Sequence, residues 1–300
     1  MLKAQVNKYV IITPAHNEQN YINYILESVV SQTSLPIQWI IVDDGSTDDT
    51  GKIIQKYCEK YPWIKLVENN NKGESRKGGV KVVRAFLLGC ENLDISDYDV
   101  IVKLDADLTL PPEYFEIIMQ TFVKDERIGL CGGQLLINVN GNWVFEKNAE
   151  YHLRGAIKAY RKSCLEQIGG IPITLNWDSL DEMKAMYLGW KVKVIPLFVK
   201  HHRVTSSTIN RGLRYAYSYG KQSYKEGYDF ILACARAVFF GMRTNPKIIS
   251  IFWFFAGFLK GVISGTKREV DPSLASFMRH FQYNRIKMKL FGDHHNDWNH

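Results

Sequence analysis

The chain has 300 residues, of which 46% are hydrophobic, so it can bury at least one large core and is not an intrinsically disordered protein. The net charge of +7 and the pI near 9.0 suit an anionic partner such as a phosphate, a nucleic acid or an acidic membrane surface. The five cysteines are scattered and form no CxxC pair, which argues against a disulfide framework or a zinc knuckle and favours a reducing cytoplasm. The N-terminal residues lead into a strand that is too short for a signal-peptide core, so we expect no export.

Short apolar runs alternate with helical periodicity from residue 8 to residue 136. The pattern predicts four strand and helix pairs, namely 9–13 with 20–33, 39–44 with 50–61, 64–69 with 78–92, and 99–107 with 111–125. Such alternation predicts an α/β fold with a mostly parallel sheet and helices on both faces. Ligands of such sheets bind outside the carboxyl ends of the strands, and the acidic pairs at 43–44 and 105/107 both fall at that edge.

The glycine motifs of the common nucleotide-binding folds are missing. No GxGxxG follows the first strand, and GESRKGGVK lacks the Lys-Ser/Thr ending of a P-loop. The run DDGSTDD begins like an EF-hand loop but lacks its order of acids and its closing glutamate. In this turn, residues 46–49 fit helix capping and dipole complementarity, whereas Asp44 can instead accept a hydrogen bond from a base or a ribose.

Five segments together carry a resemblance to a known family: VIITPAHNEQNYI, IIVDDGSTDDT, NNNKGESRKGGV, KLDADLTLPPE and WDSLDEMKAMYLGWKV. In this order and spacing, over residues 8 to 200, they resemble the family 2 glycosyltransferases, which have the GT-A fold. The resemblance implies a nucleotide-sugar donor and a nucleotide pocket lined by Thr13, Pro14, Glu18 and Asp44. It also implies that Arg76 and Lys77 approach the nucleotide or its diphosphate, for which a solvated basic turn is the alternative.

The resemblance gives the acidic pair Asp105 and Asp107 a role. The leaving group of a nucleotide sugar is a nucleoside diphosphate, and a divalent cation held by oxygen ligands neutralises the charge that builds on it. On a strand the two side chains would point to one side, which suits carboxylates converging on Mg²⁺ or Mn²⁺, and Asp105 would also contact the donor. The alternative is that Asp107 caps the helix near residues 111–112.

Two histidines, His201 and His202, stand at a strand end in VKHHRV. In related enzymes a histidine at this place can join the metal, so we expect one of them to do so. Packing at the surface or in the core is the alternative.

A direct displacement at the anomeric carbon also needs a base for the incoming hydroxyl. The family supplies an acid near a helix N-terminus, usually in an ED pair, and here the pair is reversed to DE. We expect Asp181 to be the base because we place it in the first turn of the helix that ends at residues 189–190, with Asp178 as the alternative. Both acids would also serve simply as N-terminal helix charges.

Composition changes after residue 205. We expect a catalytic domain over 1–205, with a nucleotide-sugar half at 8–110 and an acceptor half at 111–205, and a helical, partly apolar region over 206–300. Within 206–300 the longest uncharged stretch, 248–259, is twelve residues, whereas a spanning helix needs about 20. Basic residues around the apolar region 230–266 favour shallow insertion into an anionic leaflet, and a core helix packed on the catalytic domain is the alternative.

The resemblance therefore implies a metal-dependent, inverting glycosyltransferase, and the apolar, basic C-terminal region leads us to expect it at the inner, cytoplasmic face of the cell membrane. It would move a sugar from a nucleoside-diphosphate sugar to a hydroxyl of a saccharide or a lipid-linked saccharide. The alternatives are a nucleotidyltransferase, which would need a GxGTR-like loop after the first strand, and a non-catalytic membrane- or anion-binding protein. We expect no nucleic-acid partner, because the lysines and arginines are spread along the chain without a binding motif.

Overall fold

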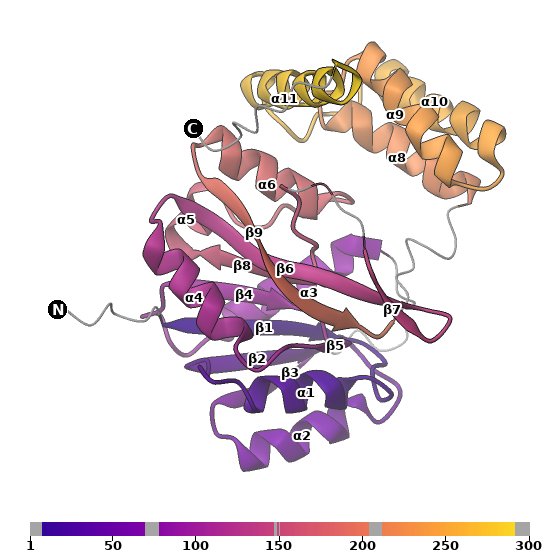
Figure 1. Ribbon diagram of the computed structural model, residues 1–300. Helices are drawn as coiled ribbons and strands as arrows, with labels where there is room; N and C mark the ends of the chain where they lie inside the picture. The colour runs from indigo at the N-terminus through magenta and orange to yellow at the C-terminus, as the bar shows by residue number, and fades with distance from the viewer. Residues whose placement is uncertain (1–7, 70–77, 147–148, 150, 204–211, 292–300) are drawn as a thin grey trace. The chain divides into compact units, whose positions relative to one another are not determined.

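The computed structural model shows two compact units, Met1–Val204 and Thr205–His300 (Figure 1). The first unit contains a sheet with helices on both faces, which confirms the predicted α/β fold, and the second is helical. The residues that the structure describes are 8–69, 78–146, 149, 151–203 and 212–291.

The first unit follows the predicted alternation of strands and helices. Its first part comprises β1 (Tyr9–Ala15), α1 (Ile22–Val30), β2 (Gln38–Asp43), α2 (Thr50–Lys60), β3 (Ile64–Glu68), α3 (Gly78–Glu91), β4 (Val100–Leu104), β5 (Leu108–Thr109) and α4 (Tyr114–Lys124). Its second part comprises β6 (Ile128–Val139), β7 (Asn142–Phe145), β8 (Ile157–Arg161), α5 (Lys162–Gln167), α6 (Trp177–Tyr187) and β9 (Lys191–His201).

The strands of the first unit form one continuous sheet in the order β3-β2-β1-β4-β8-β6-β9-β5, with β7 paired to β6. Strands β1 to β4 are mutually parallel, whereas β8 is antiparallel to both β4 and β6, and β5 is antiparallel to β9. Strands β1, β2, β3, β4, β6 and β9 therefore run in one direction, and β5, β7 and β8 run against them, so the sheet is mostly parallel, as expected, with antiparallel strands added. Strands β6 and β7 form a hairpin, and no helix lies between β7 and β8 in the part of the chain that the structure describes, which suits the antiparallel placement of β8, because a parallel return needs a crossover.

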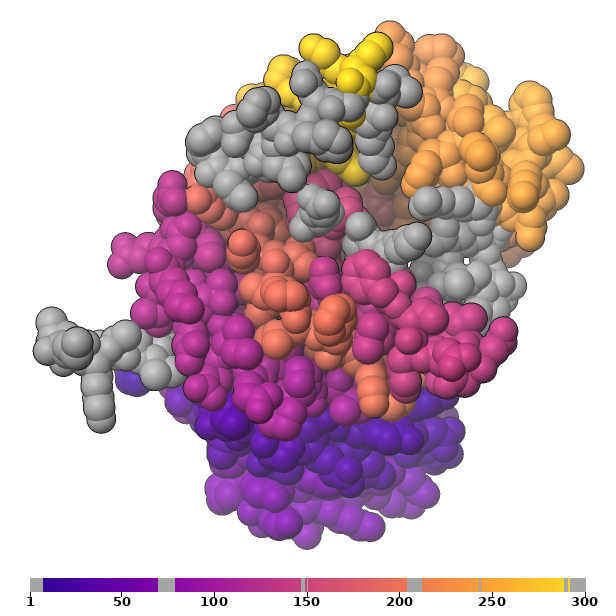
Figure 2. Space-filling model, in the orientation of Figure 1, coloured from indigo at the N-terminus to yellow at the C-terminus, as the bar shows by residue number. Residues whose placement is uncertain are grey.

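Both faces of the sheet are buried under helices. Residues of β1 alternate between two cores: Tyr9 and Ile11 pack in one with α1, α2 and α4, and Val10 and Ile12 pack in the other with α3, α5 and α6. Figure 1 shows these two helical layers on either side of the strands. Side chains of β9, by contrast, also reach the surface in the space-filling view (Figure 2). Because the helices cover both faces of the sheet, the side chains available for a functional site are those at the ends of the strands.

The second unit contains α8 (Leu213–Lys225), α9 (Phe230–Arg243), α10 (Lys247–Ile263) and α11 (Pro272–Phe291). Helices α8 and α10 approach closely at two glycines: a Cβ on Gly220 would lie 1.8 Å from the carbonyl oxygen of Phe254, and one on Gly257 would lie 1.9 Å from that of Tyr217. Only glycine permits this backbone contact. Within the described ranges, we find no helix with both the length and the apolar character needed to cross a membrane.

Candidate active site

Asp105, Asp107 and His201 gather beyond the carboxyl end of β4. The two aspartates follow β4, and the antiparallel pairing of β5 with β9 sets Leu108 opposite His201. One ligand atom from each of the three residues lies within 4.8 Å of the others. Asp107 and His201 are buried, and Asp105 is partly exposed. The sheet register thus joins positions almost a hundred residues apart into one cluster, which we call the acidic cluster.

The two carboxylates converge from a turn and not from a strand. Strand β4 ends at Leu104, so the expectation that Asp105 and Asp107 share one side of a strand is wrong. The turn is held to the sheet by the hydrogen bond from the backbone N–H of Asp105 to the carbonyl of Ala156, at 2.9 Å. Helix α4 has Glu113 as its N-cap, so Asp107 does not cap this helix.

The geometry of Asp107 and His201 fits a bound cation. The Oδ1 of Asp107 lies 3.3 Å from the Nε2 of His201, and two ligands at right angles around a small divalent cation are about 3 Å apart. The Nδ1 of His201 is buried and has no hydrogen-bond partner within the described part of the chain. Burial lowers the pKa of His201, but the hydrogen bond and charge of Asp107 outweigh it, so the pKa is raised. Two carboxylates and an imidazole form a ligand set that suits Mn²⁺ or Mg²⁺.

His202 lies apart from the acidic cluster. Its ring stacks on Tyr24 with 3.9 Å between the ring centroids, and its Nε2 lies 2.7 Å from the hydroxyl of Thr109. Of the two adjacent histidines, His201 is therefore the one that the structure brings to the two aspartates.

Two cationic side chains that the sequence analysis did not select border the acidic cluster. Lys103, almost fully buried, forms an ion pair with Asp105. Arg203 forms an ion pair with Glu18, and its Nε lies 3.7 Å from the Oδ2 of Asp107. Each cation stands two residues from a predicted ligand, Lys103 before Asp105 and Arg203 after His201. This spacing was the signal that could have identified them.

Two of the predicted donor-binding residues differ in exposure. The side chain of Thr13 is fully buried, and its hydroxyl accepts a hydrogen bond of 2.9 Å from the indole N–H of Trp39. This side chain is turned into the core, so a contact of Thr13 with a nucleotide would come from its backbone, and its place in the pocket stays a prediction. Pro14, the next residue, is partly exposed. Arg76 and Lys77 lie outside the described residues.

Glu18 and Asp44 both lie at the carboxyl edge of the sheet. The carbonyl of Glu18 accepts the backbone N–H groups of residues 21 and 22 at the start of α1, and its carboxylate pairs with Arg203. Asp44 is partly exposed, and its Oδ1 accepts a hydrogen bond of 2.7 Å from Asn69. The two acids are thus fixed by the fold at the edge where the acidic cluster stands.

Helix α6 begins at Trp177, so Asp178 lies in its first turn and Asp181 in its second. The expectation that Asp181 stands in the first turn is wrong, because the helix starts earlier than the DE pair suggests. Trp177 anchors this start: a Cβ on Gly155 would meet its ring at 2.6 Å, and one on Gly79 at 3.0 Å. Asp178 is partly exposed, whereas Asp181 has no exposure.

A buried charge network surrounds Asp181. The Nζ of Lys158 lies 2.8 Å from the Oδ1 of Asp181 and 2.9 Å from the Oε1 of Glu182, and all three side chains have no solvent exposure. Tyr160 donates its hydroxyl to the other oxygen of Asp181, and His152 lies 2.8 Å from Glu182. Burial raises the pKa of Asp181 to about 6, although Lys158 opposes this shift. We call these five residues the buried charge network.

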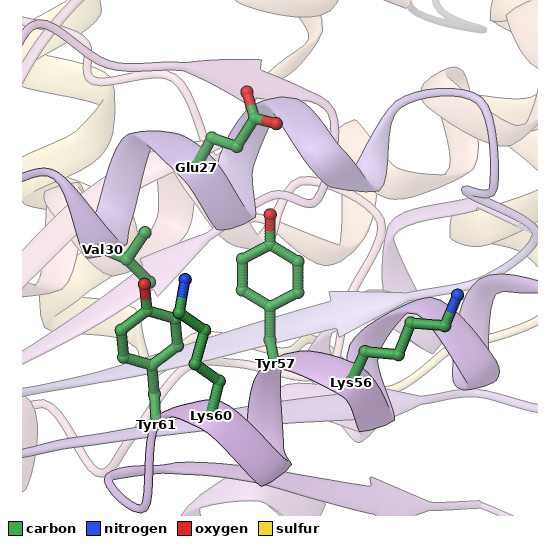
Figure 3. A pocket seen from close by; sticks show the side chains of 6 residues that line it. All are labelled: Glu27, Val30, Lys56, Tyr57, Lys60 and Tyr61. Atoms are coloured by element: carbon green, nitrogen blue, oxygen red, sulfur yellow. The ribbon is translucent and has the colours of Figure 1, made fainter.

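A separate hollow lies between α1 and α2 (Figure 3). It has a volume of about 450 Å³, and Tyr57 points across it from α2 toward α1. Its lining residues come from the C-terminal halves of both helices and from the residue that follows α2: Glu27, Val30, Lys56, Tyr57, Lys60 and Tyr61. Both helices start at the carboxyl edge of the sheet, so the hollow is at the opposite end from the acidic cluster, and we give it no role in the site.

The model of the family described as "Glycosyl transferase family 2" matches residues 10–173, more than half of the chain. The chain belongs to this family. The resemblance drawn from the five sequence segments is thereby confirmed.

Curated relatives of this family 2 glycosyltransferase match parts of it. The chondroitin synthase of Escherichia coli is 32% identical over 117 residues, which are 38% of this chain and 15% of the relative. The probable glycosyltransferase YdaM of Bacillus subtilis is 23% identical over 278 residues, 84% of this chain and 62% of the relative. The chain thus spans less than two thirds of the length of either relative.

A solved structure supports the fold. The mannosyltransferase PcManGT of Pyrobaculum calidifontis, solved with GDP-Man and Mn²⁺, superposes with a TM-score of 0.53 and 16% sequence identity. The match covers 98% of this chain and 83% of PcManGT. At this identity the likeness concerns the fold, and it confirms the GT-A fold that the sequence predicted.

Proposed function

We propose that this glycosyltransferase moves a sugar from a nucleoside-diphosphate sugar to a hydroxyl of a saccharide or a lipid-linked saccharide, with inversion at the anomeric carbon. The observation that carries the proposal is the acidic cluster at the carboxyl edge of a GT-A sheet. Such an edge is where α/β sheets bind their ligands.

Asp105, Asp107 and His201 would hold Mn²⁺ or Mg²⁺. When bound, the cation neutralises the charge that develops on the leaving diphosphate. The mannosyltransferase with Mn²⁺ in its solved complex supports this assignment.

Charge balance around the acidic cluster also favours binding of a diphosphate. Glu18, Asp105 and Asp107 contribute three negative charges, and Lys103 and Arg203 contribute two positive ones. The net charge of these five groups is negative, and a bound divalent cation would make it positive. The phosphates of a donor would then make the net charge slightly negative again. Cation and donor are therefore expected to bind more tightly together than apart.

Asp178 is the base that we propose for the incoming hydroxyl, in place of Asp181. A base must come within hydrogen-bond distance of the substrate hydroxyl, and Asp178 is partly exposed at the start of α6. The ring centroid of its neighbour Trp177 lies 5.3 Å from the Nζ of Lys103. Lys103 forms an ion pair with Asp105, so the start of α6 borders the acidic cluster. Asp181 is instead fully buried, and its two carboxylate oxygens are bound by Lys158 and Tyr160 of the buried charge network.

The remaining parts of the proposal concern domains and location. We assign catalysis to residues 1–205, with Pro14, Glu18 and Asp44 at the nucleotide and the second part of the sheet toward the acceptor. We also propose that the enzyme works at the inner face of the cell membrane. The exposed apolar side chains of residues 230–263 support this location.

A thermal-shift experiment tests the proposal and its alternatives. We expect UDP, GDP or dTDP to stabilise the protein, more strongly with Mn²⁺, and we expect Asp105→Asn and Asp107→Asn to remove the Mn²⁺ effect. A clear preference for nucleoside triphosphates would favour a nucleotidyltransferase. No stabilisation by any nucleotide would favour a non-catalytic protein. A panel of nucleotide sugars assayed for hydrolysis and transfer then identifies the donor.

A further inference from the structure

The second unit presents an apolar stripe on one side of α10. Residues Ile248, Phe252, Ala256, Leu259 and Ile263 are spaced by three or four positions, so they lie on one face of the helix. All five are exposed, Phe252 to 69% and Ile263 to 82%. The opposite side of α10, with Phe254, Gly257 and Gly261, is buried.

Helix α9 carries a second stripe of the same kind. Ile231, Ala235, Val238 and Met242 are again spaced by three or four positions, and all four are exposed. The helix packs its other side, with Ala237 and Phe240, against α8 and α10. Helices α9 and α10 pack against each other, and we call their two exposed stripes the apolar face.

The packing inside the second unit fixes the apolar face outward. The glycine contacts that join α8 to α10 leave no room for a side chain at positions 220 and 257. Turning α10 to bury Phe252 would therefore break the contact of Gly257 with the carbonyl of Tyr217. The stripe on α10 is therefore exposed because the opposite side of the helix is held against α8 by its glycine contacts.

The charged residues of the segment 230–268, which contains α9 and α10, have one sign. From residue 230 to residue 268 the sequence contains six basic residues and no acid: Arg236, Arg243, Lys247, Lys260, Lys267 and Arg268. Arg236 is taken by an ion pair with Glu226, whereas Lys247, Lys260 and Lys267 are exposed. Exposed aliphatic and aromatic side chains bordered by lysines match a lipid surface with anionic headgroups.

We propose that the apolar face of α9 and α10 docks on an anionic lipid bilayer, with its side chains in the interfacial layer and its lysines at the headgroups. No helix in the described residues qualifies as a span, so the contact is a peripheral one. The inference extends the proposed location of the enzyme. Lipid binding is measured without a sugar-transfer assay. A failure of the docking proposal can therefore be told apart from a failure of the proposed reaction.

Flotation of the full chain with vesicles tests the proposal. We expect the chain to float with phosphatidylcholine vesicles that contain phosphatidylglycerol and much less with phosphatidylcholine alone. The double variant Ile231→Asp/Phe252→Asp should lose binding. The matched control Ile173→Asp/Phe198→Asp, which changes exposed apolar residues of the first unit, should bind like the parent chain.

The lysines are tested separately. Lys247→Gln/Lys260→Gln should weaken binding to the anionic vesicles by about tenfold. Lys56→Gln/Lys124→Gln, exposed lysines of the first unit, should leave it unchanged. Circular dichroism melts verify that every variant remains folded.

Three outcomes would overturn the inference. The first is absence of flotation with either type of vesicle. The second is unchanged binding of the Ile231→Asp/Phe252→Asp variant. The third is a dimer by light scattering that Phe252→Asp converts to a monomer, without vesicle binding, because the face would then belong to a second copy of the chain.

Discussion

Lys158 and Asp181 form an ion pair of 2.8 Å in which neither side chain has any solvent exposure. The pair links β8 to α6, and Glu182 and Tyr160 complete its hydrogen bonds. A buried charge is tolerated only when it is paired, so this arrangement serves the fold of the first unit. Asp178, the base that we propose, lies three positions before Asp181 in the same helix, so on our proposal stability and catalysis depend on neighbouring turns of α6.

Replacing Lys158 should destabilise the first unit strongly. Lys158→Met leaves two buried carboxylates without their cation, and we expect a loss of about 3–5 kcal/mol in the free energy of unfolding. Chemical denaturation measures it, with Lys56→Met at the surface as the control. A Lys158→Met variant as stable as its control would show that the carboxylates do not need the cation.

The contact between His152 and Glu182 should make stability depend on pH. Burial lowers the pKa of His152, but the charge and hydrogen bond of Glu182 outweigh it, so the pKa is raised from its ordinary value of 6.5. The folded state therefore binds this proton more tightly than the unfolded state does. The stabilisation is fully present below pH 6.5 and is lost as the pH rises through the raised value.

Comparing the parent chain with His152→Gln at several pH values isolates this effect. At low pH we expect His152→Gln to cost about 1.5–3 kcal/mol, the usual value of a hydrogen bond to a charged group. The difference should shrink as the solution becomes alkaline. A difference that grows with pH would contradict the direction of the shift.

Asp178→Asn and Asp181→Asn should fail in different ways. Asp178→Asn is expected to keep the melting temperature and donor binding but to lose about 10²- to 10⁴-fold in turnover, the usual contribution of a general base. Asp181→Asn should lower the melting temperature, because it disturbs the buried charge network. Normal turnover by Asp178→Asn, with a folded but inactive Asp181→Asn, would return the role of base to Asp181.

Arg203→Gln should affect cation and nucleotide in opposite directions. The guanidinium beside Asp107 repels a divalent cation and attracts a diphosphate. Without it, we expect Mn²⁺ alone to bind more tightly and a nucleoside diphosphate to bind more weakly, each by about tenfold or about 1.4 kcal/mol. Isothermal titration measures both, with Arg127→Gln as the control. A variant that binds both ligands more weakly would indicate general damage to the site.

Local sequence patterns predicted the elements of the first unit because the strands and helices are strongly periodic. They also placed Asp105 and Asp107 at the carboxyl edge of the sheet, where the structure has them, since the motif lies at the end of a recognisable strand. The sequence could not show whether His201 or His202 lies beside the two aspartates. The register of β5 against β9 decides it, and a shift of one residue would have presented the other side chain.

Long-range contacts also decided the roles of the two aspartates of α6. The sequence suggested that the helix starts near the DE pair, whereas packing of Trp177 against Gly79 and Gly155 starts it earlier. The partners of Asp181 come from β8, more than twenty residues away. Propensity and spacing carry no information on such partners.

Binding of Mn²⁺ in the presence of a nucleoside diphosphate tests the central claim most directly. Electron paramagnetic resonance of free Mn²⁺ gives the dissociation constant for the parent chain, Asp107→Asn, His201→Ala and the neighbouring control His202→Ala. We predict that Asp107→Asn and His201→Ala abolish binding while His202→Ala retains it. Equal binding by the parent chain and His201→Ala, or a loss confined to His202→Ala, would contradict the assignment of the metal site.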